Sequence, residues 1–123
     1  MAKIEYNMLV RDNYVALLER SGKKTCETAK INDNDFLNRL ADKLEEEVDS
    51  FSCEFDAEND EKALGELADI VEVVEHIVSE MGVTDEAFHR IREARNAMYG
   101  SFDERTLLVA VTDNVENTDS SHD

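Results

Sequence analysis

The chain has 123 residues, which is enough for one domain with a modest core. Its formal net charge of −17 argues against a nucleic-acid polymer or an anionic membrane as a partner. A nucleotide is compatible with this charge, because bound divalent cations invert the local field. No apolar run approaches the ~18 residues of a transmembrane helix, no signal-peptide pattern opens the chain, and two cysteines make no disulfide framework. We therefore expect a cytoplasmic protein.

The first predicted elements are a short extended segment and a short helix. Residues 5–10 are partly apolar, and Tyr14 to Leu18 carry an amphipathic pattern that Ser21-Gly22 would end. Residues 23–32 have no helical period. They predict an extended connection to the next element.

Two long amphipathic helices follow. Asp33, Asn34 or Asp35 can cap the first, whose apolar stripe recurs every three or four residues and comprises Phe36, Leu40, Leu44, Val48 and Phe51. The acidic stretch 55–60 predicts a loop or a fraying helix end. The second helix runs from Ala63 to Met81 and would end at Gly82. Its apolar arc is wider than one partner helix requires, which predicts a further neighbour such as a second subunit.

The C-terminal third predicts one more helix, a strand and a tail. Thr84 is a suitable cap for the helix, and Gly100 would close it. Residues 106–111 are apolar and β-branched, which predicts a short strand that pairs with the N-terminal segment. Residues 112–123 are polar and acidic and predict a disordered tail. The predicted organisation is one all-α domain at residues 1–111, with short extended terminal segments.

Two acidic clusters lie on the flanks of the long helices. With 100° per residue and Leu44 at the centre of the apolar face, Glu47 lies about 60° to one side. Glu46, Ser50 and Glu54 share that flank, whereas Asp49 lies on the other. Glu66 and Asp69 share one flank of the next helix. If the helices pack antiparallel, these carboxylates can ligate a divalent cation; the alternative is a solvated acidic surface.

Five motifs, in order, resemble one known family. Tyr6-Asn7-Met8-Leu9-Val10-Arg11-Asp12 resembles the Y-N-K-L-V-R-D opening of a branch of the MazG-like, phosphoribosyl-ATP-pyrophosphohydrolase-like family. The other four motifs are Ser21-Gly22-Lys23-Lys24, Lys43-x-x-Glu46-Glu47, Glu66-Leu67-Ala68-Asp69 and Gly100-Ser101-Phe102. The likeness covers roughly residues 4 to 108.

The resemblance implies a four-helix NTP pyrophosphohydrolase fold that assembles as a homodimer or homotetramer. Members of the family use Mg²⁺, with Mn²⁺ as an alternative, to cleave nucleotides between the α and β phosphates into a monophosphate and pyrophosphate. Transferred by motif position, the metal ligands are Glu46, Glu47, Glu66 and Asp69. Glu47 is the candidate catalytic base by its position.

The chain also departs from the family pattern. The family's E-E-x-x-E motif would place a carboxylate at Ser50, and Glu54, one turn on, could compensate for it. The Lys of the opening motif is replaced by Met8. An alternative hypothesis is therefore a catalytically weakened or inactive nucleotide-binding or oligomerisation module of the same fold.

Four further residues are candidate substrate ligands: Arg11, Asp12, Lys43 and Arg95. A cationic side chain among them would bind phosphate oxygens. The competing interpretation of Arg11 and Asp12 is a local ion pair and helix cap, and that of Lys43 is an i,i+4 pair with Glu47. Arg95, late in its helix, would equally satisfy the helix dipole.

Overall fold

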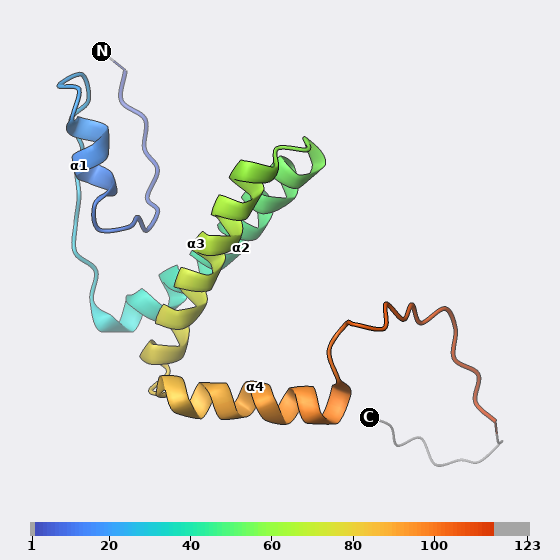
Figure 1. Ribbon diagram of the computed structural model, residues 1–123. Coiled ribbons are helices and arrows are strands. Elements are labelled where there is room, and N and C mark those ends of the chain that lie inside the picture. The colour runs from blue at the N-terminus through green and yellow to red at the C-terminus, as the bar shows by residue number, and fades with distance from the viewer. Residues whose placement is uncertain (1, 115–123) are drawn as a thin grey trace. The chain divides into compact units, whose positions relative to one another are not determined.

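The computed structural model describes residues 2–114, which contain four α-helices and no strand (Figure 1). The helices are α1 (Tyr14–Glu19), α2 (Asp33–Asp56), α3 (Asp60–Glu80) and α4 (Asp85–Tyr99). The predicted all-α class is confirmed. Residues 115–123 of the predicted disordered tail lie outside the described residues.

The chain divides into two compact units, Met1–Arg90 and Ile91–Asp123, and the division falls within α4. The first unit contains α1, α2, α3 and the start of α4, and it holds every contact of the candidate site below. The predicted single domain of residues 1–111 stays a prediction.

Helices α2 and α3 form a hairpin joined by residues 57–59 (Figure 1). The predicted loop at 55–60 is shorter than expected, because α2 continues to Asp56. The predicted cap of α2 at residues 33–35 is also wrong. Asn32 is the capping residue, and its side chain accepts from the amide of Asp35 at 2.9 Å. Asn32 has extended backbone angles, whereas Asp33 to Asp35 already belong to the first helical turn.

The hairpin holds the small core of the described chain. Leu40 of α2 and Ala63 and Val73 of α3 are the buried apolar residues. The remaining apolar positions of the two helices are half-buried or exposed, and Phe55 and Leu64 are 61% and 65% exposed. The two helices therefore bury one narrow seam against each other and leave apolar side chains beside it exposed.

The elements around the hairpin begin and end largely as predicted. Gly22 and Gly100 follow α1 and α4 with φ of +78° and +76°, a left-handed backbone that glycine adopts without strain. The Thr84 hydroxyl caps α4 by accepting from the amide of Ala87 at 3.1 Å. Cys26 and Cys53 are free thiols.

The predicted strand at residues 106–111 is wrong. These residues are exposed and irregular, and residues 5–10, their predicted partner, are irregular as well. A strand is stable only when a neighbouring strand supplies its hydrogen bonds, and no ladder forms among residues 2–114. The β-branched residues at 106–111 favour a strand, but no second strand pairs with them in the described residues. No helix in the described part of the chain is long and apolar enough to span a membrane.

Candidate metal centre

Three carboxylates converge at the seam between α2 and α3. Glu47 lies on the flank of α2 that faces α3, and its side chain is 13% exposed. Glu66 and Asp69 are half-buried and lie one turn apart on α3. One carboxylate oxygen from each residue lies within 4.8 Å of the other two. We call Glu47, Glu66 and Asp69 the acidic triad.

The surroundings of the acidic triad perturb the pKa of one of its members. The pKa of Glu66 is raised from 4.5 to about 7. The main cause is a hydrogen bond with Glu47; desolvation and repulsion by Glu47, Asp69 and Glu54 add to it. The carboxyl of Glu66 therefore holds a proton up to near-neutral pH. A divalent cation could replace that proton and relieve the same repulsion.

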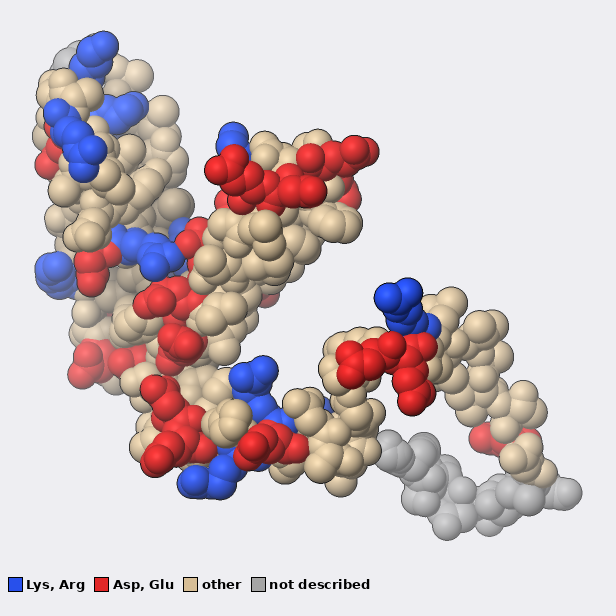
Figure 2. Space-filling view, viewed as in Figure 1, with Lys and Arg blue, Asp and Glu red and all other residues tan. Residues whose placement is uncertain are grey.

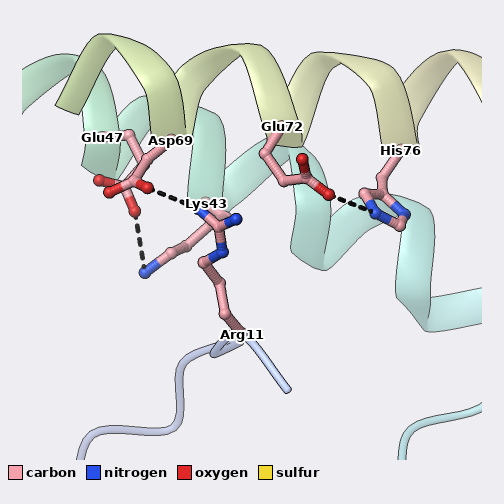
Figure 3. A network of polar contacts seen from close by, with 6 residues as sticks. All are labelled: Arg11, Lys43, Glu47, Asp69, Glu72 and His76. Atoms are coloured by element: carbon pink, nitrogen blue, oxygen red, sulfur yellow. Dashed lines mark hydrogen bonds and ion pairs between the residues drawn. The ribbon is translucent and has the colours of Figure 1, made fainter. Parts of the chain in front are cut away.

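Two cationic side chains contact the acidic triad from different segments (Figure 3). Lys43, one turn before Glu47, places its Nζ 3.3 Å from the Glu47 carboxylate and 3.6 Å from that of Glu46. Arg11 reaches from the N-terminal segment, and its Nη1 donates to Asp69 Oδ1 at 2.6 Å. The site is therefore a cluster of three carboxylates with a cation in contact with each of two of them, and its residues come from the N-terminal segment, α2 and α3.

The acidic triad fits a small, hard cation. Ligand oxygens at about 2.1 Å from Mg²⁺ lie roughly 3 to 4.2 Å apart in an octahedron. The three carboxylate oxygens, all within 4.8 Å of one another, are near that spacing before any cation draws them together. Carboxylate oxygen is also the donor type that Mg²⁺ and Mn²⁺ prefer.

The other predicted ligands have different environments. Glu46 is not one of the three converging carboxylates; its side chain is 46% exposed and pairs with Lys43. Ser50 and Glu54 are half-buried on the flank of Glu47, and Glu54 is close enough to Glu66 to raise its pKa. The sequence argument grouped Glu46, Glu47, Ser50 and Glu54 on one flank; Glu47, Ser50 and Glu54 are half-buried there, whereas Glu46 is exposed.

The two remaining predicted substrate residues are Asp12 and Arg95. Asp12 is exposed in the turn that precedes α1. Arg95 belongs to the second unit, where its guanidinium lies 5.3 Å from the centre of the Tyr99 ring. One residue that the sequence argument missed is Arg39, whose Nη1 donates to the carbonyl of Asn7 at 3.1 Å. The sequence offered one signal for it: Arg39 lies one turn before Lys43 and therefore on the same side of α2.

No model of a known protein family matches this chain, and neither a curated protein nor a solved structure does. The case for a function therefore depends on the chain's own residues. Those residues are an acidic triad with one perturbed carboxyl, and two cations in contact with it.

Proposed function

We propose that this protein is a Mg²⁺-dependent nucleotide pyrophosphohydrolase. It would cleave nucleoside triphosphates or related nucleotides between the α and β phosphates, releasing a monophosphate and pyrophosphate. The observation that carries the proposal is the convergence of Glu47, Glu66 and Asp69 at one seam. The ordered motifs of the sequence support the same reaction, since Glu47, Glu66 and Asp69 are three of the four ligands that the MazG-like resemblance implies.

The acidic triad would hold the cation, and Mn²⁺ could replace Mg²⁺ there. When bound, Mg²⁺ polarises a phosphoryl oxygen and favours deprotonation of water. Glu47 would accept the proton of the attacking water. This role is assigned by position, because Glu47 converges with Glu66 and Asp69 and lies beside Lys43.

The cations beside the acidic triad would bind the substrate. Lys43 is held at 14% exposure beside Glu47, so its ammonium would lie next to phosphate oxygens bound at the metal. Arg11 supplies a guanidinium that can bind a phosphate through two parallel hydrogen bonds. Asp12 and Arg95 stay predictions of the sequence as substrate residues, since Asp12 is exposed in the turn before α1 and Arg95 belongs to the second unit. The proposal takes no nucleic-acid polymer and no membrane as a partner, in keeping with the net charge of −17.

The protein would act as a homodimer or homotetramer. The described chain buries only three apolar residues in its core, while Phe55, Leu64 and Val71 of the hairpin are more than half exposed. Apolar surface of this kind is stabilised when another protein surface covers it. Sedimentation velocity at several protein concentrations would measure the assembly directly.

The test of the activity is pyrophosphate release from a panel of ribo- and deoxyribonucleoside triphosphates, with Mg²⁺ and then with EDTA. Metal-dependent release with the monophosphate as co-product is expected. Release of inorganic phosphate in place of pyrophosphate would contradict the proposed bond cleavage. Glu75→Gln, an exposed substitution on α3 away from the acidic triad, is the matched control and should behave as wild type.

Ser50 favours a second candidate, a nucleotide-binding module with weak or no catalysis. Ser is a poor substitute for an anionic metal ligand, and this one is half-buried on the flank that carries Glu47. Thermal stability with Mg²⁺ and a non-hydrolysable triphosphate separates this candidate from a protein with no site, because only a formed site is stabilised by its ligands. Activity gained by Ser50→Glu would identify a missing ligand as the cause of weak catalysis.

A further inference from the structure

Charge is divided unevenly between the N-terminal residues and the hairpin. Residues 1–30 carry six Lys or Arg and four Asp or Glu, a net charge of +2. Residues 33–80, which span α2 and α3, carry three Lys or Arg and 17 Asp or Glu, a net charge of −14. Figure 2 shows basic side chains gathered around the N-terminal segment and acidic ones over the hairpin. The N-terminal residues are therefore a built-in counter-charge for the acidic hairpin.

Two contacts attach this N-terminal segment to the hairpin. Arg39 donates to the carbonyl of Asn7, and Arg11 donates to Asp69 across 58 residues of sequence. The second contact is different in kind, because Asp69 belongs to the acidic triad. Its oxygen at 2.6 Å from Arg11 is also a candidate cation ligand (Figure 3).

A guanidinium and a divalent cation at Asp69 would repel each other. The Arg11 side chain is 60% exposed, so it can leave Asp69 without being buried as an unpaired charge. An exposed ion pair is weak and easily exchanged, whereas a dication interacts with three carboxylates at once. The contact between Arg11 and Asp69 is thus well suited to exchange.

We propose that Arg11 is an exchangeable counter-ion: a divalent cation displaces it from Asp69, and the freed guanidinium then binds the phosphates of the substrate. The inference rests on the proposed metal site. It assigns Arg11 two successive partners, an aspartate before cation binding and a phosphate after it. Cation binding thereby both completes the metal centre and releases a phosphate ligand, so metal and substrate bind with positive coupling.

A purely structural role for Arg11 predicts a different effect of Arg11→Gln on Mg²⁺ affinity. If Arg11 only holds the hairpin in shape, its removal would leave Mg²⁺ affinity unchanged or weaken it. If Arg11 competes for Asp69, Arg11→Gln strengthens Mg²⁺ binding in the absence of nucleotide. The expected gain is roughly two- to fivefold, the scale of one exposed ion pair. Arg39→Gln is the matched control: it removes the same charge from a cation that contacts a backbone carbonyl, and it should change Mg²⁺ affinity less than Arg11→Gln.

A reporter in the N-terminal segment follows the exchange without any activity assay. The chain has no Trp, so Tyr6→Trp introduces a single tryptophan, which can be excited selectively, at an exposed position of that segment. We expect its fluorescence anisotropy to fall when Mg²⁺ is added, and to be lower from the outset when Arg11→Gln is combined with it. A Tyr99→Trp variant, with its reporter in the second unit, records any change in overall tumbling.

The binding of phosphate by the freed Arg11 is tested with inorganic triphosphate, because this probe has no nucleobase that could contribute to binding. At saturating Mg²⁺, Arg11→Gln should weaken triphosphate binding about tenfold, the scale of one charge-assisted hydrogen bond. Tighter Mg²⁺ binding together with weaker triphosphate binding supports the exchange. If wild type binds Mg²⁺ but Arg11→Gln does not tighten it, or the anisotropy of the Tyr6→Trp variant does not change, the exchange is wrong and the metal site stands. If neither protein binds Mg²⁺, the proposed metal site is wrong and the exchange falls with it.

Discussion

The two flanks of α2 carry similar residues in different surroundings. On one flank Glu47 is 13% exposed and converges with Glu66 and Asp69 of α3. On the other flank Glu45 and Asp49 are exposed and border a shallow groove with Leu44 and Val48. On the first flank, a hydrogen bond with Glu47 helps to raise the pKa of Glu66 to about 7. Acidic composition alone therefore carries no information about a site; convergence at a seam with restricted solvent does.

The largest expected effect comes from removing the perturbed carboxyl. Glu66→Gln keeps the shape and hydrogen-bonding capacity of the side chain but loses the anionic ligand. We expect metal-dependent turnover to fall by about 100-fold or more, because the two remaining carboxylates, Glu47 and Asp69, would hold the cation too weakly. Turnover is measured as pyrophosphate release, and Mg²⁺ affinity by calorimetry.

Two measurements keep this result interpretable. Helical content from circular dichroism should equal that of wild type, since Gln and Glu have similar helix propensities. Glu75→Gln, on the same helix but exposed, should retain wild-type turnover. Undiminished turnover in Glu66→Gln would place the chemistry elsewhere in the molecule.

The second prediction concerns the pH dependence of Tm, which the raised pKa of Glu66 should change and the exposed flank of α2 should not. The folded state binds this proton more tightly than the unfolded state, whose value is 4.5. The stabilisation is therefore complete below pH 4.5 and is lost as pH rises to about 7. In EDTA, we expect the Tm of wild type to fall by a few degrees across this window relative to that of Glu66→Gln.

Adding Mg²⁺ should cancel most of that loss in wild type, because the cation supplies the positive charge that the proton supplied. Glu45→Gln, on the exposed flank of α2, should leave the pH dependence as it is in wild type. If the Tm of wild type and that of Glu66→Gln change in parallel over this pH range, the prediction is wrong. The carboxylates of the acidic triad would then not repel one another in solution as they do in the structure.

Local sequence rules predicted the helices and the flank that carries the acidic triad. The 3.6-residue period located α2 and α3, and the same period put Glu47, Ser50 and Glu54 on one side, together with Glu46, which is exposed in the structure. Because Glu66 and Asp69 are three residues apart, their shared flank needed no structure to predict. A short connection then made an antiparallel hairpin the simplest packing.

The features that sequence reasoning missed depend on contacts distant in the chain. The strand predicted at residues 106–111 required a partner that pattern alone cannot supply. The cap of α2 moved to Asn32 because four adjacent residues, 32–35, can all cap, and backbone geometry chooses among them. The pairing of Arg11 with Asp69 spans 58 residues and has no local signal.

The smallest expected effect on turnover is that of Glu46→Gln, compared with the same substitution at its neighbour Glu47. The motif resemblance makes both Glu46 and Glu47 metal ligands, whereas the convergence at the seam includes Glu47 alone. Successive residues on a helix point 100° apart, so two adjacent carboxylates rarely face one small cation. Glu46→Gln should therefore lower turnover by no more than about threefold, through its contact with Lys43, because an exposed ion pair contributes little. Glu47→Gln should lower it at least tenfold more. Equal losses in the two variants, measured by pyrophosphate release at saturating Mg²⁺, would mean that α2 rotates or bends when the cation binds and brings Glu46 into the site.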